Sequence, residues 1–316
     1  MTTKRIAFII NPVGPRLVTE MEARFPGVAE FYKPDEIAPI ADRFDAVMAI
    51  DRALPEGFLP AASRLKWVHA QCHGFGFLLN DELIEHGATV TNARGVHAES
   101  VAEHAFSMLL GLTRRLAEYR QIQQEHRWQR LMTDTLVGKT MCVIGVGTIG
   151  SAIARRAKSF DMKVAGVDIR PVVCESLSSL SGPDDLDSAI STADVVAVAV
   201  PFNETTRNMF PRDRLLKMKP GSYLINIARG GIVDEQAVVD MLNSGRLKGA
   251  GFDVFETEPL PADSPMWDAP NCILLPHSAS FTEFCYDRLL ELVSEQIRRF
   301  LAGEPLLNVV KEGLAP

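Results

Sequence analysis

Residues 140–151 read Thr-Met-Cys-Val-Ile-Gly-Val-Gly-Thr-Ile-Gly-Ser, an apolar run that leads into a Gly-x-Gly-x-x-Gly pattern. The apolar run predicts a buried strand, and the residues after the last glycine have a helical pattern. In such a strand–turn–helix unit, Gly145 permits the tight turn, Gly147 lets a pyrophosphate approach the backbone, and Gly150 lets helix and strand pack closely. Because amides at a helix N-terminus bind phosphate, the stretch predicts a dinucleotide site.

An acidic residue ends the next apolar strand, about 20 residues beyond Gly150. This residue is Asp168, which follows Val164-Ala165-Gly166-Val167. A carboxylate at this position accepts the ribose hydroxyls and repels a 2'-phosphate, so NAD is favoured over NADP. Arg170 lies two residues further on and could instead hold a phosphate, which keeps NADP as the alternative.

Short runs rich in Val and Ile alternate with helical patterns along nearly the whole chain. This alternation is typical of βαβ units on parallel sheets, so the predicted fold class is α/β. We expect two doubly wound sheets: a smaller flavodoxin-like sheet in the first part of the chain and a Rossmann dinucleotide-binding sheet in the second. The expected strands are 5–10, 46–50, 66–70 and 89–91 in the first sheet, and 140–146, 163–168, 194–200, 222–227, 248–253 and 272–275 in the second.

The pattern predicts two domains, one of which is formed by two separate segments of the chain. Residues 1–97 form the first part of a substrate domain, 98–278 the dinucleotide-binding domain, and 279–316 return to the substrate domain through a helix over 283–301. A proline-free amphipathic helix over 98–119 joins the domains and offers a dimer interface.

The composition excludes several classes of protein. The 316 residues are 47% hydrophobic and 23% charged, as expected of a folded, water-soluble protein without a membrane role. A net charge of -7 argues against nucleic acid as the main partner. The five cysteines have no C-x-x-C spacing, and the seven histidines form no ligand pair, so no metal site is expected. The apolar run after Lys4-Arg5 is too short for a signal peptide and predicts the first strand, consistent with a cytoplasmic protein.

Three polar side chains stand just beyond the carboxyl ends of predicted strands. Arg229 follows the strand 222–227, Glu258 follows 248–253, and His277 follows 272–275. Open α/β sheets bind ligands at this edge, so we expect the three to converge on one crevice.

At these residues the chain resembles the D-isomer-specific 2-hydroxyacid dehydrogenases. The similar blocks are Gly145–Gly150, Asn226–Gly231, Asp253–Pro261 and Pro276–Ser280, in the family's order and spacing, and the likeness covers essentially the whole chain. It implies that Arg229 binds the substrate carboxylate, that His277 is the acid/base, and that Glu258 orients His277.

The resemblance also implies contacts with the cofactor. Asp253 corresponds to an acid that bonds the nicotinamide carboxamide, and the turn 200–206 to one that passes the adenosine. The further cofactor residues it implies are Thr148, Ile149, Pro201, Thr206, Ile227, Ala228, Arg229, His277 and Ser280. Glu99, Glu103 and His104 are expected to have surface roles.

The loop expected to bind substrate departs from the family pattern. It reads Gln71-Cys72-His73-Gly74-Phe75-Gly76-Phe77-Leu78, with the glycines present and the family's Asp absent. Gly74, Phe75 and Gly76 would contact the substrate through backbone amides, and the two phenylalanines favour a bulkier or more apolar substrate.

The chemistry of these residues agrees with an NAD-dependent oxidoreductase that interconverts a D-2-hydroxy acid and its 2-keto acid in a cleft between two domains. Such a reaction needs a charged anchor, a proton donor and a nicotinamide. The alternative is a dinucleotide-sensing corepressor or scaffold. A formate dehydrogenase is disfavoured, because those enzymes pair the histidine with glutamine where this chain has Glu258.

The expected partners are the small hydroxy or keto acid and a second copy of the chain. Residues 121–136 are polar and contain Trp128. They predict either a solvated connection or a dimer arm anchored by that tryptophan.

Overall fold

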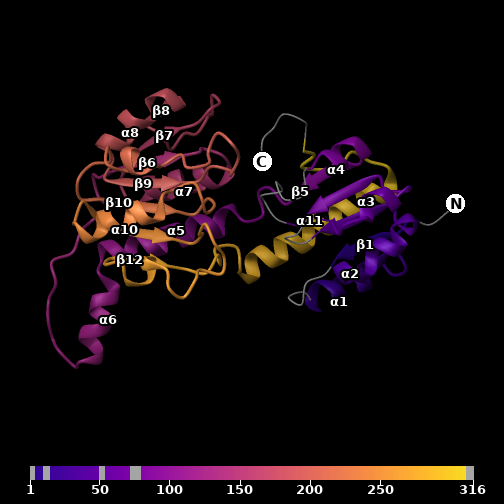
Figure 1. Cartoon of the computed structure of the whole chain (residues 1–316), viewed down its shortest axis with the longest axis horizontal. Coiled ribbons are helices and arrows are strands. Elements are labelled where there is room, and N and C mark those ends of the chain that lie inside the picture. The colour runs from indigo at the N-terminus through magenta and orange to yellow at the C-terminus, as the bar shows by residue number, and fades with distance from the viewer. Residues whose placement is uncertain (1–3, 10–14, 50–53, 72–79, 311–316) are drawn as a thin grey trace. The chain divides into compact units, whose positions relative to one another are not determined.

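The computed structural model describes residues 4–9, 15–49, 54–71 and 80–310. The chain forms two compact units, Met1–His97 with Thr282–Pro316, and Ala98–Phe281. Each unit is built on its own parallel sheet (Figure 1). The α/β fold class predicted from the sequence is therefore confirmed.

The first unit contains a five-stranded sheet in the order β2-β1-β3-β4-β5, the flavodoxin-like order. Its strands are β1 (Ile6–Ile9), β2 (Ala29–Tyr32), β3 (Ala46–Ala49), β4 (Trp67–Ala70) and β5 (Thr89–Asn92). The sequence missed β2, an edge strand whose four residues are all half-buried and therefore lack the apolar run of a central strand.

Helices cover this first sheet. They are α1 (Pro15–Arg24), α2 (Pro34–Ile37), the 3-10 helix η1 (Ala38–Arg43), α3 (Phe58–Ala61), α4 (Asp81–His86) and α11 (Glu283–Ala302). The return helix predicted over 283–301 is α11, which packs Leu290, Val293 and Ile297 against β-strand residues that include Trp67.

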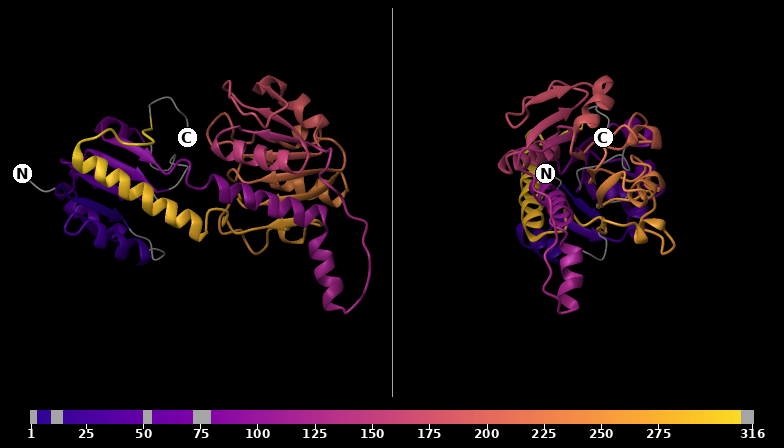
Figure 2. Two further views of the ribbon diagram at one scale, coloured as in Figure 1. Left: turned by 180° about the vertical axis from the view of Figure 1, so that it is seen from behind. Right: turned by 90° about the vertical axis from the view of Figure 1, so that its left-hand side faces the viewer.

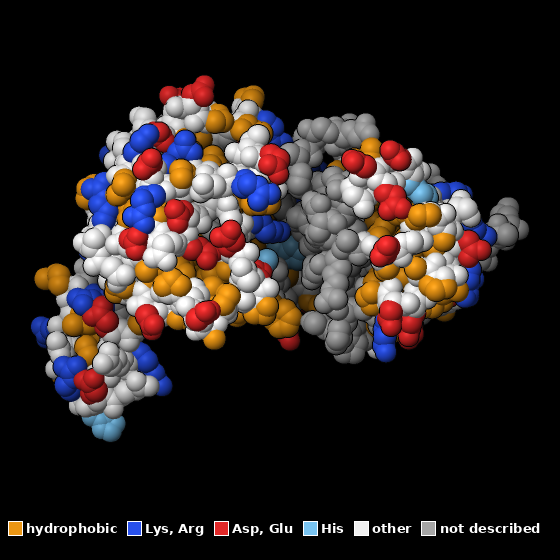
Figure 3. Space-filling model, in the orientation of Figure 1, with side chains coloured by type: hydrophobic (Ala, Val, Ile, Leu, Met, Phe, Trp, Pro, Cys, Tyr) orange, Lys and Arg blue, Asp and Glu red, His pale blue; other side chains and the backbone are white. Residues whose placement is uncertain are grey.

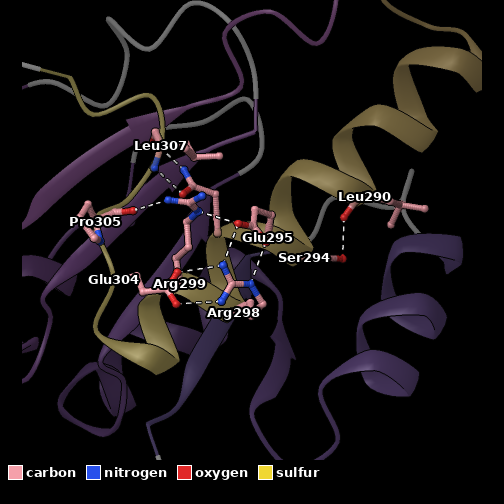
Figure 4. A network of polar contacts seen from close by, with 9 residues as sticks. Leu290, Ser294, Glu295, Arg298, Arg299, Glu304, Pro305 and Leu307 are labelled. Atoms are coloured by element: carbon pink, nitrogen blue, oxygen red, sulfur yellow. Dashed lines mark hydrogen bonds and ion pairs between the residues drawn. The ribbon is translucent and has the colours of Figure 1, made fainter.

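Helix α11 ends in a network of charges, shown in Figure 4. Arg298 pairs with Glu295 and Glu304, and Nε of Arg299 lies 2.6 Å from Oε1 of Glu295. Hydrogen bonds from Arg298 and then Arg299 lower the pKa of Glu295 to about 2. Gly303 follows in the left-handed conformation and terminates the helix.

The second unit contains a seven-stranded parallel sheet in the order β12-β11-β10-β9-β6-β7-β8. The strands are β6 (Thr140–Ile144), β7 (Lys163–Val167), β8 (Ser179–Ser181), β9 (Val195–Val198), β10 (Ser222–Asn226), β11 (Leu247–Phe252) and β12 (Cys272–Leu274). The prediction of six strands was wrong by one, because β8 is a short edge strand, Ser-Leu-Ser, without an apolar pattern. Strand order reverses between β6 and β9, where Rossmann sheets bind dinucleotides.

The helix predicted over 98–119 is two helices, α5 (Ala98–Thr113) and α6 (Leu116–Gln124). Arg115 between them has a φ of +53° and breaks the helix. Helix α5 is largely buried within its unit, whereas α6 projects from it (Figures 1 and 2). The unit's other helices are α7 (Thr148–Ser159), α8 (Leu186–Thr192), α9 (Arg212–Leu215), α10 (Glu235–Asn243) and the 3-10 helices η2 (Pro183–Asp185) and η3 (Pro265–Asp268).

The surface carries charged side chains of both signs, as the composition of the sequence leads one to expect. Figure 3 shows acidic and basic side chains interspersed on the face that it displays. Within the described ranges, no helix combines the length and apolar character that a membrane crossing requires. The same ranges contain no cluster of three or more His, Cys, Asp or Glu side chains suited to a metal ion.

Candidate active site

The predicted phosphate-binding turn lies between β6 and α7, at the carboxyl edge of the seven-stranded sheet. Gly145 has a φ of +88°, and a Cβ there would lie 2.7 Å from the backbone oxygen of Ala199. A Cβ on Gly150 would lie 1.9 Å from the oxygen of Gly145, whereas one on Gly147 would meet nothing within 4 Å. Packing therefore requires the first and third glycines, and the space in front of the second is open to a ligand.

Asp168 directly follows β7 and is tied to this turn. Its Oδ2 accepts a hydrogen bond from the N–H of Val146 at 2.8 Å, and its Oδ1 accepts one from the N–H of Arg170 at 3.0 Å. The Arg170 side chain is exposed, with Nε 3.8 Å from Oδ1 of Asp168. Together with the N-terminus of α7, these groups fit the ribose and pyrophosphate of a dinucleotide.

His277 and Glu258 come from the loops after β12 and β11, and their side chains meet. Nδ1 of His277 lies 2.7 Å from Oε2 of Glu258, whose Oε1 accepts a hydrogen bond from the N–H of Phe255 at 2.9 Å. His277 has a φ of +50°, which non-glycine residues seldom adopt. The carboxylate engages Nδ1, and Nε2 of His277 has no hydrogen-bond partner among the described residues, so this nitrogen is available to a ligand.

Arg229 lies in the loop after β10, and its Nη1 donates to the backbone oxygen of Ala228 at 2.6 Å. With the described residues it forms no ion pair, so its charge is available to an anion. The next residue, Gly230, packs directly on the turn before Glu258, since a Cβ there would lie 1.9 Å from the oxygen of Phe255. The loops that carry Arg229 and Glu258 are therefore in backbone contact.

Asp253 follows β11 and is almost fully buried, with 2% of its side chain exposed. Its Oδ1 accepts from the N–H of Ser278 at 2.9 Å, and its Oδ2 from the N–H of Ala279 at 3.1 Å. Nε2 of His104, on α5, lies 2.9 Å from Oδ1. Asp253 thus holds the two residues that follow His277.

The surface role expected for His104 was wrong, because its side chain is only 17% exposed and bonds to buried Asp253. The surface roles of its neighbours are confirmed. Glu99 pairs with Arg155 and Arg156, and Glu103 pairs with Arg156.

Glu235 lies beside the candidate site, and the sequence did not indicate it. It begins α10, and its Oε1 accepts a hydrogen bond from the N–H of Glu256 at 2.7 Å. Burial raises the pKa of Glu235, and the charges of Glu256, Glu258 and Asp234 add to the rise, while the bond from Glu256 opposes it. Two carboxylates, Glu235 and Glu258, therefore hold consecutive amides of the turn beside His277.

The turn after β9 is closed by Thr206. Its hydroxyl donates to the oxygen of Pro201 at 2.7 Å and accepts from the N–H of Asn203 at 2.9 Å. The hydroxyl is thus engaged within the turn, and it shapes the backbone near Pro201.

The remaining predicted site residues are dispersed along the same edge of the sheet or fall outside the described residues. Thr148 and Ile149 begin α7, Ile227 and Ala228 follow β10 and are buried, and Ser280 is exposed. Gly74, Phe75 and Gly76 lie outside the described residues.

The chain matches the family model of the D-isomer specific 2-hydroxyacid dehydrogenase NAD-binding domain over residues 106–279. A glyoxylate reductase of Thermofilum pendens is 37% identical over 264 residues, covering 81% of this chain and 78% of that protein.

Solved structures of similar proteins share the fold. A D-lactate dehydrogenase of Aquifex aeolicus, complexed with NAD and lactic acid, aligns with a TM-score of 0.83 and 27% identity over 95% of this chain and 96% of that one. A D-isomer specific 2-hydroxyacid dehydrogenase of Xanthobacter autotrophicus, in complex with NADPH, aligns with a TM-score of 0.83 and 27% identity over 98% of each chain.

The family match spans more than half of the chain, and it includes the glycine turn, Asp168, Arg229, Glu258 and His277. Both predictions from the sequence, an enzyme of this family and an NAD(P) cofactor, are confirmed. The chain belongs to the D-isomer specific 2-hydroxyacid dehydrogenases, a family of NAD(P)-dependent oxidoreductases.

Proposed function

We propose that this chain interconverts a 2-keto acid and its D-2-hydroxy acid, with His277 as the acid/base, Glu258 as its partner and Arg229 as the carboxylate anchor. The observation that carries the proposal is the 2.7 Å contact between Nδ1 of His277 and Oε2 of Glu258, beside a loop whose Arg229 forms no ion pair with the residues that the structure describes. The glyoxylate reductase and the D-lactate dehydrogenase that resemble the chain act on small acids of this class.

His277 supplies the proton when the keto acid is reduced. The Glu258 carboxylate fixes the ring through Nδ1, so a proton on Nε2 is presented to the carbonyl oxygen. In oxidation, the neutral ring takes the hydroxyl proton back at the same nitrogen. Bound NAD(P)H supplies the hydride that the carbonyl carbon accepts.

Arg229 orients the substrate. A guanidinium binds a carboxylate through two parallel hydrogen bonds, which fixes the plane of the adjoining carbonyl group. Gly230 keeps this loop against the turn of Glu258, so the anchor and the acid/base stay in one arrangement.

NAD is the proposed cofactor in preference to NADP. The Asp168 carboxylate is only 7% exposed and is held by two backbone amides, one of them in the glycine turn, and a fixed negative charge at this position disfavours a 2'-phosphate.

The alternative of a dinucleotide sensor without turnover is not favoured. A sensor has no need of an acid–base pair next to an anion anchor, and the chain retains both.

The proposal is tested with a panel of 2-keto acids of increasing side-chain size, from glyoxylate to phenylpyruvate, each assayed with NADH and NADPH. We expect turnover on at least one acid, and we expect His277→Gln to lower kcat by about 100-fold or more. His126→Gln, an exposed histidine beyond α6, is the matched control and should match the parent. Tight NADH binding without turnover on any acid would establish the sensor instead.

We also propose a homodimer whose interface includes α6 and the segment that follows it. Trp128 and Met132 in this segment are 98% and 90% exposed, and a second copy of the chain would bury both. Helix α5, the other part of the interface expected from the sequence, is mostly buried within its own unit.

A further inference from the structure

We propose that His104 is a positioning residue for the reaction, acting through Asp253 on the peptide segment that holds His277. The proposal rests on the acid/base role of His277 proposed above. His104 lies on α5, away from the reacting atoms, and it would determine the position of His277, the residue that donates the proton.

The segment after His277 has little freedom of its own. His277 itself has a φ of +50°, and a non-glycine residue keeps this conformation only where neighbouring contacts impose it. The N–H groups of Ser278 and Ala279 both bond to the Asp253 carboxylate. Asp253 is therefore the group that fixes the backbone leaving His277.

Asp253 is in turn held by His104. An ionised carboxylate can only accept hydrogen bonds, so the 2.9 Å contact requires Nε2 of His104 to carry the proton and donate it. Oδ1 then receives two donors, His104 and Ser278, and Oδ2 receives Ala279. Since no lysine or arginine pairs with Asp253 among the described residues, His104 is the side chain there that donates a hydrogen bond to this buried carboxylate.

Helix α5 contacts the same segment a second time. The hydroxyl of Ser100 donates to the backbone oxygen of Ala279 at 2.6 Å. Ser100 and His104 are four residues apart and so lie on the same face of the helix. One face of α5 thus donates a hydrogen bond directly to the carbonyl of Ala279. Through Asp253, the same face also holds the amides of Ser278 and Ala279.

The close approach of α5 to the sheet depends on small residues. A Cβ on Gly251 of β11 would lie 2.8 Å from Cβ of Met108, and one on Gly249 would lie 3.1 Å from Leu112. Met108 follows His104 by one helical turn. The glycines of β11 therefore bring His104 within hydrogen-bonding distance of the residue that follows the strand.

The test compares two substitutions of His104. His104→Gln keeps an N–H donor at a similar reach, whereas His104→Phe keeps the ring volume and loses the donor. Glu103→Gln, at an exposed position of the same helix, is the matched control. Two quantities are measured: kcat and KM with the best keto acid, and hydrogen exchange of the cofactor-free chain over the peptide that contains residues 278 and 279.

We expect His104→Phe to lower kcat about tenfold and to speed exchange at residues 278 and 279 about tenfold, with the rest of residues 98–281 unchanged. His104→Gln should restore both values to within about threefold of the parent. Wild-type kcat and exchange in His104→Phe would overturn the proposal, as would faster exchange throughout the unit, which would indicate a role in folding alone. Neither result would touch the role of His277, which is decided separately by the loss of activity in His277→Gln.

Discussion

The α-carbon of Gly230 lies so close to Phe255 that a Cβ on the glycine would be 1.9 Å from the Phe255 oxygen and 2.4 Å from the nitrogen of Glu256. The nearest neighbours of such a Cβ are all backbone atoms, which cannot move away as a flexible side chain can. The loops after β10 and β11 are consequently in contact at residue 230, where no side chain larger than the hydrogen of glycine fits.

Gly230→Ala is expected to separate the Arg229 loop from the turn of Glu258. Arg229 and His277 would then no longer be correctly placed to contact the same substrate molecule. As a result, kcat/KM should fall by about 100-fold or more. Steady-state kinetics measures the change. Gly182→Ala is the control, since a Cβ there meets nothing within 4 Å; an equal loss in both variants would contradict the argument.

Glu258→Gln is expected to lower kcat for reduction by about tenfold or more. The glutamine oxygen can still accept from the N–H of Phe255, but its NH2 group would then face Nδ1 of His277 and no longer accept the hydrogen bond that fixes the ring. Steady-state kinetics with the best keto acid measures the change. A kcat equal to that of the parent would refute the coupling.

Asp168→Ser is expected to shift the cofactor preference toward NADPH. The substitution removes the charge that repels a 2'-phosphate and leaves the exposed Arg170 to bind one. The ratio of kcat/KM for NADH to that for NADPH should fall at least about tenfold. Asp184→Ser, in η2, controls for loss of charge; an unchanged ratio in Asp168→Ser would disprove the assigned role.

Glu235→Gln is expected to flatten the pH dependence of stability. Because burial raises the pKa of Glu235 in the folded chain, the folded state binds this proton more tightly than the unfolded state. The free energy of unfolding therefore falls as pH rises from the ordinary range of a carboxyl group through the raised pKa. Glutamine keeps an acceptor for the N–H of Glu256 and cannot ionise.

Urea unfolding at a series of pH values, from the ordinary range of a carboxyl group upward, measures this effect. The variant should lose less stability than the parent over the series. Glu175→Gln, at an exposed position, should behave like the parent, and an identical loss in all three proteins would rule the effect out.

Replacing both Trp128 and Met132 by serine is expected to convert a dimer into a monomer, because the change removes the largest exposed apolar side chains of the segment after α6. Sedimentation velocity gives the mass. Val173→Ser is the matched control, since Val173 is also 98% exposed but lies elsewhere in the unit. A monomeric parent, or a dimeric double variant, would refute the interface.

Most of what could be predicted from the sequence depended on patterns among residues that are close together in the chain. The glycine turn at Gly145–Gly150 is a property of a few adjacent residues, and so are the apolar runs of β6 and β10. Glu258 and His277 were predicted to meet because each follows a strand, and neighbouring parallel strands end at the same edge. Their meeting needed no knowledge of side-chain packing.

The features that were missed depend on contacts between distant parts of the chain. His104 and Asp253 are 149 residues apart, and nothing in the sequence around His104 distinguishes it from a surface histidine. Glu235 begins a helix, where an acid is common for reasons of the helix dipole alone. The break at Arg115 was missed because arginine is a good helix former, and only its surroundings explain the positive φ.

The hydrogen bond between Ser100 and Ala279 has a consequence for protein engineering. Ser100 is in the first turn of α5, and Ala279 comes shortly before the unit's last residue, Phe281. A fragment excised as residues 98–281 would therefore have neighbouring termini. That arrangement suits backbone circularisation, or insertion of the fragment into a loop of a host protein as a nucleotide-responsive module.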